Sequence, residues 1–151
     1  ERTRISGAAA DLLNSVAPRL SDRFDALIPL FLPALLTICA RTNKVASKRS
    51  QKTLALICTY CKLPVSLLPF FREAVKDKAP SLRAAAVECA LTLLQAMDGE
   101  KDLERLRRRG VGENVEIIIK HGATDASSEV RGLTKALFQV YMGKYPDRVE
   151  A

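Results

Sequence analysis

The sequence predicts an all-α fold, a solenoid of stacked antiparallel helical hairpins. Two observations predict it: every apolar segment has the helical period, and the polar turns between these segments repeat. In residues 81–97 the apolar stripe consists of Leu82, Ala86, Cys89, Leu93 and Met97. In residues 128–145 it consists of Val130, Leu133, Leu137, Tyr141 and Tyr145. No segment shows a sustained alternation of apolar and polar residues, so we expect no strand.

The expected elements follow one another along a single domain, residues 1–151. The first is a lone helix at about residues 5–17, the second helix of a repeat whose first helix lies outside this fragment. Three hairpins follow, at about residues 22–62, 63–97 and 113–146. In the last two hairpins a shorter, more apolar helix precedes a longer amphipathic one. Pro80 and Ser81 open one long helix, and Pro146 stops the last.

The turns inside the hairpins carry the repeat. "KDKAPSLR" and "TDASSEVR" share an Asp, an apolar residue five positions later and an Arg six positions later, and "TNKVASKR" has Asn43 in place of the Asp. Asn43 to Asp77 is 34 positions and Asp77 to Asp125 is 48, a difference of 14. The charged segment "DGEKDLERLRRRGVG", residues 98–112, is the insertion, and its Leu103 and Leu106 are expected to touch the core. Hairpins at this spacing are typical of a HEAT-like solenoid.

The recurring Asp and Arg residues are interpreted as structural. Asp77 and Asp125 precede the second helices of their hairpins, where a carboxylate is favoured by the helix dipole. Each can pair with the Arg six residues on, Arg83 or Arg131. In a stacked array these arginines would bridge neighbouring turns and form a ladder.

Positive charge is confined to one third of the chain. Residues 26–72 contain no Asp or Glu. They contain seven basic residues: Arg41, Lys44, Lys48, Arg49, Lys52, Lys62 and Arg72. The chain has 24 basic and 17 acidic residues, +7 in all, so without these seven the two signs balance at 17 each. A segregated excess of this kind indicates a surface for an acidic partner.

Turns of one type align along one edge of a solenoid, which places several basic residues together. The expected binding residues at or beside these turns are Arg41, Lys44, Lys48, Lys76 and Lys78. Lysines in loops are also commonly just solvated, so a passive surface remains an alternative.

Length and composition exclude other classes. The 151 residues include 48% apolar and 27% charged residues, enough for a buried core in one domain. The longest apolar run, Ala26–Ala40, is shorter than the roughly 20 residues that span a bilayer, and it contains two prolines. We therefore expect no membrane partner. The N-terminus has no secretory signal and does not begin with Met, which favours a fragment of a cytosolic or nuclear protein, expected to be a monomer.

No metal, cofactor or catalytic site is expected. Cys58 and Cys61 form a C-x-x-C, but no second cysteine pair stands at ligand spacing, and the single histidine, His121, is distant. The four cysteines are interpreted as small core residues in a reducing compartment. The sequence contains no G-x-S-x-G, glycine-rich phosphate loop or H-E-x-x-H, and His121 ends a helix. We expect a binding protein and not an enzyme.

Several stretches resemble the TOG domains of the CLASP family, the cytoplasmic-linker-associated microtubule proteins. "GATDASSEVRGLTKALFQVYMGKYPDRVEA", residues 122–151, is similar to the closing repeat, with its aromatic pair Phe138 and Tyr141 and its P-x-R ending. "LIPLFLPALLTICARTNKVASKRSQKTLALI" resembles the central repeat, with its proline-containing first helix and a loop ending in K-V. "FREAVKDKAPSLRAAAVECALTLL" resembles the repeat that follows.

This resemblance implies a HEAT array that binds tubulin through the turns inside its repeats, in the cytoplasm and on the microtubule cytoskeleton. The turns that carry over are residues 41–45, which include Asn43 with Lys44 in the K-V position, and residues 76–79. The chain contains no Trp, the residue that the family often presents in its first turn, and the region of that turn is absent. Between Gly122 and Glu129 there is no positive side chain, which argues against a contact at the third turn.

Two other partner classes stay open. A HEAT-like scaffold could direct the same charge at a different acidic protein. Nucleic acid is the less favoured alternative. A basic surface attracts phosphate groups by its charge alone, and basic HEAT-like DNA glycosylases exist. The chain has only 5% aromatic residues, few for stacking a displaced base.

Overall fold

The computed structural model describes the backbone of residues 2–149 and the side chains of residues 7–149. The described backbone is helical and has no strand, which confirms the predicted all-α class. Its elements are α1 (Arg2–Leu20), the 3₁₀ helix η1 (Ser21–Leu27), α2 (Ile28–Cys39), α3 (Lys44–Cys61), α4 (Pro64–Ala74), α5 (Pro80–Ala96), α6 (Glu100–Leu106), α7 (Val111–Ala123), α8 (Ser128–Lys144) and α9 (Pro146–Val149).

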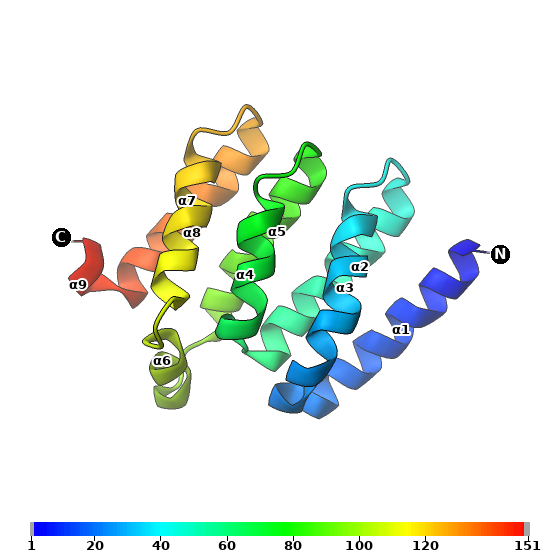
Figure 1. The fold of residues 1–151 in the computed structure, drawn as a ribbon, viewed down its shortest axis with the longest axis horizontal. Helices are drawn as coiled ribbons and strands as arrows, with labels where there is room; N and C mark the ends of the chain where they lie inside the picture. Colours follow the sequence, from blue (N-terminus) through cyan, green and yellow to red (C-terminus); the bar gives the residue numbers. More distant parts are fainter. Residues whose placement is uncertain (1, 150–151) are drawn as a thin grey trace.

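Three helical hairpins stack side by side (Figure 1). The second helices α3, α5 and α8 pack in sequence to form one layer, and α1 packs against α3 at the end of that layer. The first helices α2, α4 and α7 form the other layer, with α4 between the other two. Because each hairpin buries its apolar face against the next, the array is a solenoid with one continuous core.

Local sequence explains most helix boundaries. Proline occupies the first turn of α2, α4 and α5, where its missing N–H leaves no hydrogen bond unmade. Asn43 and Ser127 cap α3 and α8 through their side chains. Ser21 and Lys62, both with φ of 48°, follow α1 and α3, where the chain turns away from the helix axis.

Two boundaries differ from the sequence-based expectation. α1 runs from Arg2 to Leu20 and not from about residue 5 to 17, so it continues through Pro18. A proline one turn from a helix end removes only one internal hydrogen bond, and packing against α3 compensates for it. α7 begins at Val111, two positions before the expected residue 113, because the chain reverses at Gly110, whose φ is 88°.

The predicted apolar stripes form the core. All five residues of the stripe that runs along α5 to Met97 are buried, and so are four of the five in the stripe that runs along α8 to Tyr145. Leu133 is only partly buried, although it packs against the core. In the insertion, α6 buries Leu106 and partly buries Leu103, as the sequence predicted.

The four cysteines lie inside this core as free thiols. Burial raises the pKa of Cys39 and of Cys61 to about 12, which keeps both thiols protonated and unreactive at neutral pH. Across the described residues, His, Cys, Asp and Glu do not gather into a group of three suited to a metal ion. Within the same range, none of the helices combines the length and the apolar character needed to span a bilayer.

Candidate partner-binding edge

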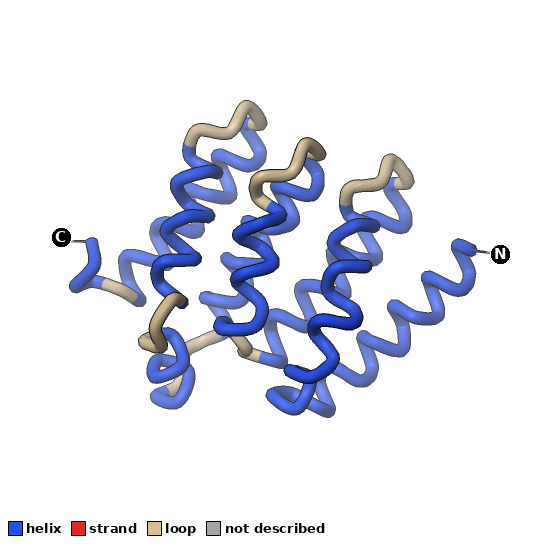
Figure 2. Tube along the Cα trace, in the orientation of Figure 1, coloured by secondary structure: helices blue, strands red, loops and turns tan. Residues whose placement is uncertain are grey.

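The turns inside the three hairpins line up along one edge of the solenoid. They comprise residues 40–43, 75–79 and 124–127, and Figure 2 shows them as three neighbouring tan loops. We call this edge the turn edge. The six residues expected to bind a partner all belong to the first two turns or to the start of α3, so the fold brings them to one side of the molecule.

In the first turn, Asn43 has a structural task. Its side-chain Oδ1 accepts hydrogen bonds from the backbone N–H groups of Val45 at 3.1 Å and Ala46 at 3.2 Å. The amide therefore caps α3 and orients the residues that follow. Arg41 and Lys44 are exposed on either side of it, and Val45 is 62% exposed, an unusual position for a β-branched apolar residue.

The first three turns of α3 carry a row of lysines. Lys44, Lys48 and Lys52 are spaced by four residues and are all exposed, so they lie on one face of the helix. No acidic residue occupies the first turn of α3. Among the described side chains, none of the three lysines forms an ion pair. The three ammonium groups repel one another along the face, and the positive end of the helix dipole repels the lysine in the first turn, so this arrangement destabilises the helix.

A hollow of about 280 Å³ adjoins the first turn, between α1, α2 and the start of α3. Its walls are largely apolar, with Leu13, Phe31 and Leu35 among them, and Arg41, Asn43 and Val45 line it as well. The exposed basic residues thus stand beside a largely apolar recess.

In the second turn, one of the two lysines has a carboxylate beside it. Lys76 lies 3.4 Å from Glu73. Hydrogen bonds from Arg72 and Lys76 lower the pKa of Glu73, which is the expected effect of two cations on a carboxylate. Lys78 is exposed and forms no ion pair with the described residues, which makes it the more available cation of this turn.

The other basic residues of the acid-free segment 26–72 are engaged elsewhere. Lys62 pairs with Asp102 at 2.8 Å, and Arg72 donates to Asn114 Oδ1 at 2.9 Å, so both tie neighbouring repeats together. Arg49 extends its guanidinium over Gly7 of α1. The uncompensated charge is therefore concentrated around the first turn and the start of α3.

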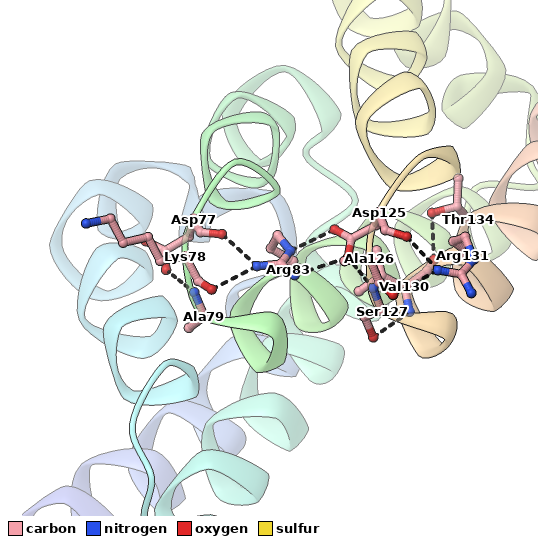
Figure 3. Close-up of polar contacts among 10 residues, drawn as sticks. All are labelled: Asp77, Lys78, Ala79, Arg83, Asp125, Ala126, Ser127, Val130, Arg131 and Thr134. Carbon is pink, nitrogen blue, oxygen red and sulfur yellow. Dashed lines mark hydrogen bonds and ion pairs between the residues drawn. The ribbon is translucent and has the colours of Figure 1, made fainter.

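The Arg83 guanidinium joins the second turn to the third (Figure 3). Its Nε donates to Asp125 Oδ2 at 2.7 Å, and its Nη2 donates to Asp125 Oδ1 at 3.1 Å. Its Nη1 donates to the backbone carbonyls of Asp77 at 3.0 Å and Lys78 at 2.9 Å. The two side chains are only 15% and 7% exposed. The hydrogen bonds from Arg83 lower the pKa of Asp125, and those to Asp125 raise the pKa of Arg83.

The pairing inside each turn is not the one anticipated from the sequence. Asp77 directs Oδ1 to the backbone N–H of Ala79 at 2.9 Å, and Asp125 does the same with Ser127 at 2.8 Å. Arg131 binds the carbonyls of Asp125 at 2.7 Å and Ala126 at 2.9 Å, and the carboxylate of neither aspartate pairs with the Arg six residues on. Each aspartate carboxylate accepts a hydrogen bond from the backbone of its own turn, so the arginine six residues later binds the carbonyls of the turn and not the carboxylate.

Comparison with known proteins assigns the chain to a family. The family model described as CLASP N terminal matches residues 1–151, the whole chain. The chain belongs to the CLASP N terminal family. Its turn edge and its Arg83–Asp125 bridge are thus features of a CLASP N terminal chain. The last two residues of the family-like closing segment, 150 and 151, lie outside the described residues.

Several curated proteins are similar to this CLASP N terminal chain. Protein peg1 of Schizosaccharomyces pombe is 29% identical over 137 residues, 91% of this chain and 9% of that protein. Protein stu-1 of Neurospora crassa is 25% identical over 147 residues, 97% of this chain and 13% of that protein. The CLIP-associated protein of Arabidopsis thaliana is 26% identical over 148 residues, 97% of this chain and 10% of that protein. The chain therefore spans only about a tenth of the length of the curated relatives it matches.

Proposed function

We propose that this CLASP N terminal chain is a tubulin-binding module of a microtubule-associated protein in the cytoplasm. The first turn, with Arg41 and Lys44, and the second turn, with Lys78, make the contact with an acidic face of tubulin. Lys48 and Lys76 add charge beside these contacts, and Asn43 holds the first turn in shape. The ladder residues Asp77, Arg83, Asp125 and Arg131 act on the turns' geometry and not on tubulin.

The row of lysines at the start of α3 is the observation that carries this proposal. Each like-charged pair four residues apart costs about 0.2 to 0.5 kcal/mol, and a cation at a helix N-terminus costs a similar amount. Lys44, Lys48 and Lys52 thus lower the stability of α3 and form no ion pair among the described side chains. An acidic partner supplies the compensation that the fold itself does not.

The test is a charge reversal with opposite effects on stability and on binding. Lys44→Glu places a carboxylate in the first turn of α3, where the helix dipole favours it, so the melting temperature should stay constant or rise. Binding to tubulin, measured by gel filtration with unpolymerised tubulin and by co-sedimentation with microtubules, should weaken. The loss should shrink as salt rises, because the Debye length falls from about 10 Å at 0.1 M to about 3 Å at 1 M.

Lys135→Glu is the matched control, since Lys135 is exposed on α8 and away from the turn edge. It changes the net charge equally and should leave tubulin binding intact. Tubulin binding that survives the simultaneous reversal of Arg41, Lys44 and Lys78 would refute the proposal. Equal losses of tubulin and of duplex DNA with Lys44→Glu would favour the nucleic-acid alternative.

A further inference from the structure

A second group of unpaired cations lies on the edge of the solenoid opposite the turn edge. Arg107, Arg108 and Arg109 connect α6 to α7 and are exposed. Figure 1 shows α6 at the far end of the hairpins from the loops that form the turn edge. The 13-residue helix α7 separates this connection from the third turn, a distance of about 20 Å at 1.5 Å per residue. Because that exceeds the Debye length of about 8 Å in physiological salt, the two edges act independently.

The three arginines share one hollow. A recess of about 330 Å³ is lined by all three and by residues of α7, the end of α8 and α9. Gly110, with φ of 88°, turns the chain sharply after Arg109 and so begins α7 beside the recess. The first turn of α7 lines the same recess through Gly112 and Glu113, and the Glu113 carboxylate accepts backbone hydrogen bonds at this helix N-terminus.

Most other charges that line this recess are already paired. Arg148 donates to Glu116 at 2.6 Å and to Glu113 at 3.2 Å, and Lys144 pairs with Asp98 at 3.0 Å. Among the described lining residues, Asp147 is the carboxylate without an ion pair, against three unpaired arginines. Arg148 is shared between two glutamates, so that group carries one excess negative charge, and the uncompensated charge at the recess is 3 − 1 − 1 = +1.

We propose that this recess, the arginine recess, binds an acidic peptide segment rich in glutamate or aspartate. A guanidinium offers a planar pair of donors that matches a carboxylate, and three in succession match a run of acidic side chains. The recess offers no aromatic face for a base, because the ring of Tyr145, which lines it, is buried with its hydroxyl donating to the Leu106 carbonyl at 2.7 Å. An extended acidic peptide therefore fits it better than a nucleic acid.

The experiment measures the affinity of the whole chain for a fluorescein-labelled glutamate homopeptide by fluorescence anisotropy. Reversal of Arg107, Arg108 and Arg109 to Glu should weaken binding by at least about tenfold, because three attractive contacts become repulsive. The control reverses three exposed cations elsewhere, Arg23, Lys120 and Lys135. Each triple reversal lowers the formal net charge by six, from +7 to +1.

The two triple variants distinguish a specific binding site from a general electrostatic attraction of the whole chain. A tenfold loss confined to the arginine triple supports the proposal, whereas equal losses in both triples would reduce the recess to part of a diffuse positive surface. Circular dichroism and the melting temperature check that both variants fold, and Arg108→Glu alone serves if the triple does not. Tighter binding of a single-stranded DNA oligonucleotide than of the peptide, lost in the same variant, would also overturn the acidic-peptide assignment. The arginine triple should leave tubulin binding intact, so this test is independent of the turn edge.

Discussion

At the scale of single residues, Arg83 has the most consequential position, since one guanidinium joins two repeats through four hydrogen bonds. Arg83→Ala would leave the poorly exposed carboxylate of Asp125 without its cation. Removing one partner of a buried pair costs about 3 to 5 kcal/mol, and partial exposure here brings the expected loss to about 2 to 3 kcal/mol. Denaturant unfolding measures it.

Arg131→Ala is the matched control for that loss. Arg131 makes the same two bonds to its turn's carbonyls, but among the described side chains it has no carboxylate partner, so its removal should destabilise the chain by less than half as much. If Arg131→Ala left stability unchanged and abolished tubulin binding, Arg131 would belong to the binding surface and not to the ladder.

The Arg83–Asp125 ion pair makes the stability of the fold depend on pH, with a sign that follows from the pKa shift of Asp125. The pKa of Asp125 is lowered in the folded chain by its hydrogen bonds from Arg83. A lowered folded-state pKa contributes stability above the unfolded value of about 4 and loses it as the pH falls through the folded pKa. Melting temperatures measured from pH 7 down to about pH 3 should therefore drop below pH 4. Asp125→Asn should flatten part of that drop, and a profile identical to wild type would exclude Asp125 as its source.

At the scale of the helices, the core stripe of α5 should dominate stability. Leu93 is fully buried, so Leu93→Ala removes apolar contact and leaves a cavity, at about 2 to 5 kcal/mol. Leu30→Ala makes the same chemical change on α2, where the side chain is 68% exposed, and should cost less than about 0.5 kcal/mol. A Leu93→Ala variant that melts at the wild-type temperature would remove Leu93 from the core.

Periodicity was sufficient to predict these helices because it reports directly on burial. The stripes of α5 and α8 are visible in the sequence, and Pro80 marks where α5 begins and Ser127 where α8 begins. η1 was not predicted, since Ser21–Leu27 carries no pattern that separates a 3₁₀ helix from an irregular entry into α2. The sequence did not predict that α1 continues through Pro18, because proline usually ends a helix. In the structure, packing against α3 stabilises the last turn of α1.

For the candidate site, the sequence predicted which charges share an edge but not which of them are free. That Lys76 meets Glu73 follows from one turn of helix and could have been anticipated. By contrast, Lys62 and Asp102 are 40 residues apart, and only the stacking of α6 under the second hairpin brings them together. The Arg83 pairing could not be predicted from the sequence for the same reason. The recurring spacing of six residues identified Arg83 as a structural residue, but its carboxylate partner, Asp125, lies in the next repeat.

At the scale of the whole molecule, a solenoid distributes its stability along the array, so the position of a helix in the stack should determine how often it opens. α1 stands at one end and packs mainly on α3 and η1, whereas α5 contacts helices of all three hairpins. Native-state hydrogen exchange, read by mass spectrometry of peptic peptides, should therefore show the lowest protection in α1 and the highest in α5. In Arg83→Ala, protection of α7 and α8 should fall more than that of α3, because the bond between the second and third turns is lost. Uniform protection, with α1 as slow to exchange as α5, would instead mean that the array unfolds only as a single cooperative unit.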